Sequence, residues 1–130
     1  MRKTDKKIAN QLREGLTAVC EHALAAYPGF AWITHVVDYA LFPKSLRIIC
    51  VFNTEQQLTS FTQSGHKAAL LVVIQRTLGQ YGVKLNDMTQ QVVFDTETAC
   101  EHQDNGNWAL RLSDANRRAK TARLTPHGLN

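Results

Sequence analysis

The stretch from Asn53 to Gly82 constrains the fold more than any other part of this chain. It carries two helical patterns in succession, separated by Ser64-Gly65, and strand-like segments lie on both sides of it. Thr54 followed by Gln57 predicts a capping box, in which the hydroxyl and the side-chain amide each satisfy a free backbone donor at the helix start. The apolar stripe of the second helix consists of Leu70, Ile74, Leu78 and Tyr81. We therefore expect two consecutive helices joined at a single glycine.

A long helix and two strands are predicted before this stretch. Thr4 is the expected cap of the helix, and Pro28-Gly29 its end, because proline cannot continue the hydrogen-bond ladder. Gly15 predicts close packing, since a helical glycine costs about 1 kcal/mol relative to alanine. Residues 30–39 are rich in aromatic and β-branched residues and predict a strand. Residues 46–52 are apolar on both faces and predict a central strand.

The C-terminal part of the chain predicts a β-hairpin. Residues 92–100 have the composition of a third strand, and Asn105-Gly106 tolerates the positive φ angles of a tight turn. Beyond the turn, Trp108, Leu110 and Leu112 alternate with other residues as in a returning strand. We therefore expect a single α+β domain over residues 1–113, in the order α-β-β-α-α-β-β, with an added C-terminal hairpin strand. Residues 114–130 are predicted to form a basic, flexible tail.

Composition and charge bound the class of protein. The chain has 130 residues, of which 44% are hydrophobic and 20% are charged, as in a soluble globular domain. The longest nearly apolar run, residues 68–74, is shorter than the roughly 20 residues of a membrane span. The basic N-terminus precedes a polar helix and no apolar signal core, so we expect a cytoplasmic location. Residues 1–7 and residues 113–130 each carry a net charge of +3, against −2 for the rest, so the ends are the expected contacts with a polyanion.

The predicted order of the first six elements is similar to that of type II KH domains, which bind single-stranded nucleic acids. In length and segment order the chain resembles the ribosome-binding factor A family, in which two helices following a strand are kinked at Ala-x-Gly. Here the kink reads Gln63-Ser64-Gly65-His66-Lys67, with Gly65 at the glycine position and Gln63 in place of the alanine. The resemblance implies a small, non-enzymatic RNA-binding or ribosome-associated factor.

Under this interpretation, the backbone amides of Ser64, Gly65 and His66 meet a phosphate at the start of the second helix, where the helix dipole favours anions. Lys67 adds positive charge, with Lys44 or Arg76 as a helper. The alternative is that Gly65 serves only as the joint between two packed helices.

The clearest basic cluster in the sequence lies in the C-terminal tail. Its members are Arg117, Arg118, Lys120 and Arg123. They could form a helix that orders against RNA or a partner, and the alternative is a solvated tail.

Two further functional classes compete with RNA binding. Residues 67–82 are superficially similar to the C-terminal DNA-binding part of the Fis nucleoid protein, which would make the chain a DNA-binding regulator. The segment is too short for two helices and a turn, so we expect no helix-turn-helix there. A protein-interaction module is the other class, in which a sheet edge or the terminal hairpin receives a strand from a partner protein.

We find no signature of catalysis, and no cofactor or metal is expected. His35 and Asp38 form the one close acid–base combination in an apolar setting, and such residues are usually structural. Cys-Glu-His occurs at residues 20–22 and again at 100–102, which could in principle supply four zinc ligands. On the first helix, Cys20 and His22 point to different sides and would chelate poorly, whereas Cys100 and His102 would share a face of a strand. Coincidence is the favoured explanation.

Overall fold

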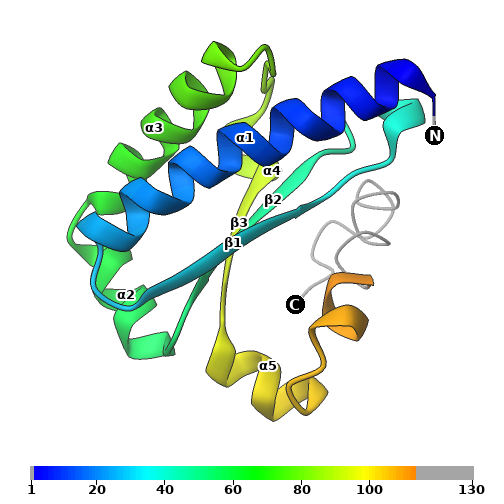
Figure 1. Cartoon of the computed structure of the whole chain (residues 1–130). Coiled ribbons are helices and arrows are strands. Elements are labelled where there is room, and N and C mark those ends of the chain that lie inside the picture. The colour runs from blue at the N-terminus through cyan, green and yellow to red at the C-terminus, as the bar shows by residue number, and fades with distance from the viewer. Residues whose placement is uncertain (1, 114–130) are drawn as a thin grey trace.

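The computed structural model of this chain describes residues 2–113, which form a three-stranded sheet with helices on both faces (Figure 1). The elements run in the order α1 (Lys3–Ala26), β1 (Phe30–Val36), the 3-10 helix η1 (Tyr39–Leu41), β2 (Arg47–Phe52), α2 (Glu55–Gln63), α3 (His66–Gln80), α4 (Met88–Gln91), β3 (Val92–Thr96) and α5 (Glu97–Asp104). A further helical segment covers residues 108–113. The mixed α+β class predicted from the sequence is confirmed. Among the helices of residues 2–113, none is long and apolar enough to cross a membrane.

The strand β2 is the centre of the sheet, as its sequence predicts. It pairs antiparallel with β1, where Ile49 lies opposite Thr34, and parallel with β3, where Cys50 lies opposite Phe94. Residues 48–52 of β2 are buried on both faces. The parallel pairing requires a crossover connection, which α2 and α3 provide between β2 and β3.

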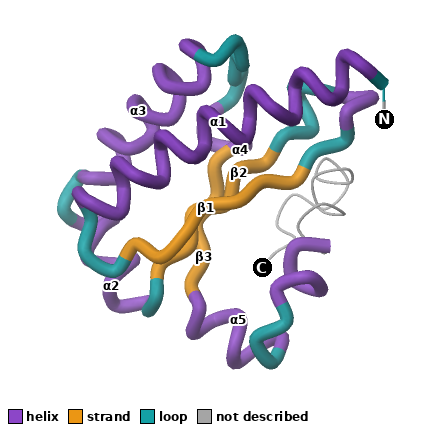
Figure 2. Tube along the Cα trace, viewed as in Figure 1, coloured by secondary structure: helices purple, strands orange, loops and turns teal. Residues whose placement is uncertain are grey.

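One face of the sheet is covered by α1 and α3, which run antiparallel to each other (Figure 2). The two helices pack closely at Gly15, where a Cβ atom would lie 2.6 Å from Cδ2 of Leu78. Close packing at this glycine was predicted and is confirmed. The core between the helices and the sheet includes Leu12, Val19, Ile48, Phe52, Leu70 and Ile74.

The helix ends follow their sequence signals with two exceptions, the second half of the capping box at Thr54 and the cap predicted at Thr4. Thr54 caps α2 by accepting a hydrogen bond from the Gln57 amide, although the Gln57 side chain meets the Thr54 hydroxyl and not the backbone. The break at Gly65 is present, and Gly82 adopts the positive φ expected after α3. Thr4 is not the cap of α1, because the helix already begins at Lys3 without a side-chain cap.

The predicted C-terminal hairpin strand is wrong. β3 ends at Thr96, whose hydroxyl accepts from the Ala99 amide and so caps α5 where a continued strand was expected. Asn105 and Gly106 do adopt positive φ angles, of 53° and 76°, but they join α5 to another helical segment. The local turn signal was therefore correct, and the type of element on each side of it was not.

The helical segment 108–113 covers the second face of the sheet together with α5. The Glu97 carboxylate accepts a hydrogen bond from the indole of Trp32 on β1 at 2.8 Å and from that of Trp108 at 2.7 Å. The two indole rings meet edge to face, with centroids 4.7 Å apart. Val51 of β2 lies opposite Trp32, so the two side chains are on the same face of the sheet. These contacts fix the C-terminal helices against that face.

Candidate functional site

The predicted phosphate site lies at the joint between α2 and α3. Gly65 adopts φ 86° and ψ 0°, a left-handed conformation that residues with a side chain rarely adopt. Apart from Gly65 itself and its two neighbours in the chain, no residue has an atom within 4 Å of the position that a Cβ on Gly65 would occupy. All four predicted residues, from Ser64 to Lys67, are exposed to solvent. The joint is therefore open, and glycine is required there by the backbone and not by close packing of another element.

The first turn of α3 presents backbone donors at this joint. The N–H groups of a first helical turn have no acceptor within their own helix, and the cap Gly65 has no side chain to supply one. The dipole of a helix of 15 residues adds partial positive charge at the same end. The Ser64 hydroxyl is directed elsewhere, because it donates to the carbonyl of Phe61 at 2.9 Å. Two of the three amides predicted to meet the phosphate are already used, because that of Ser64 donates to the Ser60 carbonyl at 3.0 Å and that of Gly65 to the Thr62 carbonyl at 3.4 Å. The donors left for an anion are those of the first turn of α3, from His66 onward, where the helix dipole also acts.

Two side chains of the joint are anchored on aromatic rings. The His66 ring lies 5.3 Å from that of Tyr27 at the end of α1. The ammonium of Lys67 lies 5.2 Å from the ring centroid of Phe94 on β3, in cation–π geometry. Lys67 thus connects α3 to the edge strand while remaining exposed. Both contacts restrict where these side chains can move around the open glycine.

The predicted helper residues do not gather at the joint. Arg76 is exposed on α3, but it is nine residues beyond Lys67, or about 14 Å along the helix axis. Lys44 precedes the amino end of β2, whereas Phe61 beside the joint contacts Phe52 at the carboxyl end. Lys44 and Arg76 would therefore each contact a part of the ligand that lies away from the joint. The four tail residues, Arg117, Arg118, Lys120 and Arg123, lie outside the described residues.

The folded chain separates basic from acidic residues, and the sequence prediction, which assigned the positive charge to the ends of the chain, missed this separation. Residues 2–13 hold five basic residues and one acidic residue, and they lie mainly on α1, over the sheet. Residues 56–86, which include α3, hold three basic residues and no acidic one. Residues 85–110 hold five acidic residues and no lysine or arginine. The layer formed by α1 and α3 is thus basic, and the side formed by β3 and α5 is acidic. Runs of like charge within these elements make this pattern visible in the sequence.

On the acidic side, Arg111 is the one lysine or arginine among the described residues, and its side chain is held in a network of hydrogen bonds. The guanidinium binds Asp95 through two hydrogen bonds and Asp104 through a third at 2.9 Å. Hydrogen bonding to Asp95 raises the pKa of Arg111 above its ordinary value, so the charge is fixed. The ring of Trp108 lies 5.9 Å from the guanidinium carbon. We assign this network to holding the C-terminal helices on the sheet.

In the part of the chain that the structure describes, the cysteine and histidine side chains are not gathered into a metal centre. Cys20 lies on α1, on the side of the sheet opposite α5, which carries Cys100 and His102. Within residues 2–113, no three His, Cys, Asp or Glu residues come together as metal ligands would. Burial raises the pKa of the Cys50 thiol to about 12, as expected for a core residue with no reactive role.

The other sequence candidates have structural roles in the described region. Burial lowers the pKa of His35 on β1, and the Asp38 carboxylate caps η1 by accepting from the Ala40 amide at 3.1 Å. Residues 66–80 form one uninterrupted helix, α3, and there is no turn that would divide them into a helix-turn-helix.

No protein-family model matches the chain, and neither the curated proteins nor the solved structures contain a match.

Proposed function

We propose that this protein is a small, non-enzymatic RNA-binding or ribosome-associated factor that contacts a phosphate at the α2–α3 joint. The observation that carries the proposal is the open, left-handed Gly65 at the amino end of α3. Backbone amides at such a position bind anions without a charged side chain, and Lys67 adds a cation beside them. A glycine with no steric neighbour leaves room for the close approach of a sugar-phosphate backbone.

The order of the elements supports the same function by analogy. Apart from the short helices η1 and α4, the chain places a helix, two strands, two helices and a strand around one three-stranded sheet, and this is the order expected of a KH-like chain. Function resides in sites and not in folds, so the joint carries the proposal and the fold contributes only an expectation.

Binding of fluorescently labelled single-stranded RNA tests the proposal. We expect the affinity to fall as salt rises, with a slope of log K against log salt of about −0.7 for each phosphate contacted. Sedimentation of the protein with ribosomal particles, before and after nuclease treatment, tests the association with ribosomes. Absence of RNA binding at low salt, together with no association with particles, would refute the proposal.

A second candidate function is a protein-interaction module, and the edge strand β1 favours it. β1 pairs with β2 on one side only, and its seven residues contain no lysine, proline or acidic residue that would discourage strand addition. The predicted docking site on a terminal hairpin does not exist, and β1 is the sheet edge without an acidic residue, whereas the other edge strand, β3, carries Asp95. Association with one partner protein that persists after nuclease treatment, and is lost when Thr34→Pro blocks the edge, would support this function over RNA binding.

A further inference from the structure

The basic residues of the helical layer form a surface at the end of α3 opposite the joint. On α1, Lys3 and Lys7 lie one turn apart on the same side as Gln11. Gln11 in turn contacts the turn after α3, since a Cβ on Gly82 would lie 2.7 Å from its Nε2 atom. Lys84 follows two residues later and is exposed between the buried Val83 and Leu85.

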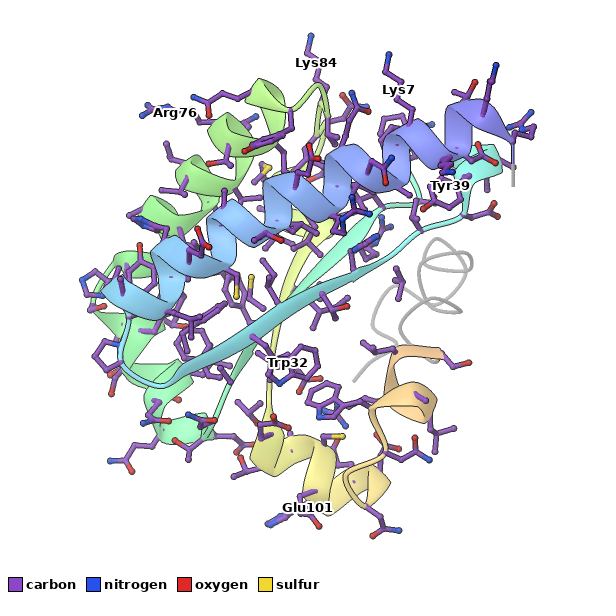
Figure 3. The ribbon with its side chains drawn as sticks, in the orientation of Figure 1. Lys7, Trp32, Tyr39, Arg76, Lys84 and Glu101 are labelled. Atoms are coloured by element: carbon purple, nitrogen blue, oxygen red, sulfur yellow. The ribbon has the colours of Figure 1, made fainter. Side chains whose placement is uncertain are left out.

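Figure 3 shows how these side chains lie. Lys7 and Lys84 are directed to the same side, at one end of the α1–α3 pair, and Arg76 extends from the outer side of α3. Glu101 on α5 is directed to the opposite side of the molecule. We name the set Lys3, Lys7, Arg76 and Lys84 the distal basic surface.

Few acidic groups oppose this surface in the described region. Asp5 on the same helix is paired with Arg2 at 3.5 Å. The Asp87 carboxylate accepts hydrogen bonds from the Thr89 hydroxyl and the Gln90 amide at the start of α4. Glu14, one turn beyond Gln11, is exposed and marks the limit of the surface along α1. Among the described residues, none of the four basic side chains forms an ion pair with an acidic one.

We propose that the distal basic surface is a second phosphate-contact site, so that one RNA strand runs along the helical layer from the α2–α3 joint to Lys7 and Lys84. This inference rests on the proposed function. The 15 residues of α3 separate the two sites by about 22 Å. With one phosphate about every 3.4 Å in a stacked strand, about seven nucleotides are needed to reach both sites. RNA length is then a determinant of affinity.

The test compares oligouridylates of four and twelve nucleotides, bound to the full chain in a fluorescence anisotropy titration. In the variant K7Q/K84Q, we expect affinity for the twelve-nucleotide RNA to fall roughly tenfold or more at 0.1 M salt, with a salt slope smaller by about 1.4. Affinity for the four-nucleotide RNA, which cannot span both sites, should change by less than about twofold.

A control variant separates local contact from net charge. H102E/A109E also changes the formal charge by −2, at exposed positions on the acidic side, and should leave both affinities nearly unchanged. Equal affinity of K7Q/K84Q and the unmodified protein for the longer RNA, with loss of binding in G65D, overturns the second site and leaves the proposed function standing. An equal loss in the control variant also overturns it. Absence of RNA binding by the unmodified protein overturns both proposals.

Discussion

Arg111 and Asp95 form two parallel hydrogen bonds, from Nε to Oδ2 at 2.6 Å and from Nη2 to Oδ1 at 2.9 Å. The pair joins the helical segment 108–113 to β3, and only 17% and 22% of the two side chains are exposed. Planar, bidentate pairs of this kind are stronger than single hydrogen bonds and hold their partners in a fixed orientation. This contact therefore holds the helical segment 108–113 over the second face of the sheet.

Replacing Arg111 by leucine should destabilise the protein by about 2 kcal/mol, because Asp95 and Asp104 would keep their negative charges without the cation between them. Urea unfolding followed by circular dichroism measures the change. Arg111→Lys preserves the charge but not the planar geometry, so its loss should be smaller. An unchanged unfolding midpoint in Arg111→Leu would show that the network of Arg111 with Asp95 and Asp104 contributes nothing to stability.

Two glycines in helices should respond in opposite ways to alanine. Gly79 lies in α3 with no atom within 4 Å of a Cβ position, so Gly79→Ala should stabilise the protein by about 1 kcal/mol through helix propensity alone. At Gly15 the new methyl group would lie 2.6 Å from Leu78, which is fully buried and cannot move aside easily. Gly15→Ala should therefore be destabilising, and Gly15→Val more so, by about 1–3 kcal/mol.

Thermal or urea unfolding of the glycine variants measures both effects. If Gly15→Ala is as stabilising as Gly79→Ala, then α1 and α3 do not approach each other at Gly15 as closely as the structure shows.

The sequence was sufficient to predict the elements whose signals are local. Both faces of β2 are apolar, which marked it as the central strand, and an isolated glycine at position 65 marked the break between α2 and α3. The failure lay after Thr96, where β-branched residues and Asn-Gly are typical of a hairpin. What decides the structure there is contact with residues distant in the sequence, such as the bond between Trp32 and Glu97 across 65 positions. No local pattern carries that information.

Only the part of the candidate site that depends on local signals could be predicted from the sequence. The joint at Ser64 to Lys67 could be located from the helix signals alone, and the structure adds that it is open. Lys3 and Lys7 were assigned to a charged end of the chain. Since α1 begins at Lys3, the structure places them instead on a helix beside the turn that carries Lys84.

Burial of His35 should make stability depend on pH. Desolvation lowers the pKa of His35 in the folded protein below the value of about 6.5 in the unfolded chain. The unfolded state then binds more protons than the folded state between these two values, so the free energy of unfolding decreases as pH falls from about 6.5 to the folded pKa. Above about 6.5 this contribution is constant.

Urea unfolding between pH 5 and pH 8 tests the role of His35 against that of the other histidines. The variant His35→Gln should show a weaker dependence on pH than the unmodified protein over the acidic part of this range. Identical slopes in the two proteins would mean that His35 is not the group responsible.

The most direct test of phosphate binding at the α2–α3 joint compares Gly65→Asp with Gly65→Asn in RNA-binding titrations. Both side chains have nearly the same shape, and both residues tolerate left-handed backbone better than most, so the cost in stability should be similar. Only aspartate places a negative charge beside the amides of α3. We predict that Gly65→Asn retains most of the affinity for a short single-stranded RNA and that Gly65→Asp loses at least about tenfold, as expected for repulsion of a phosphate. Equal affinity in the two variants would contradict the account.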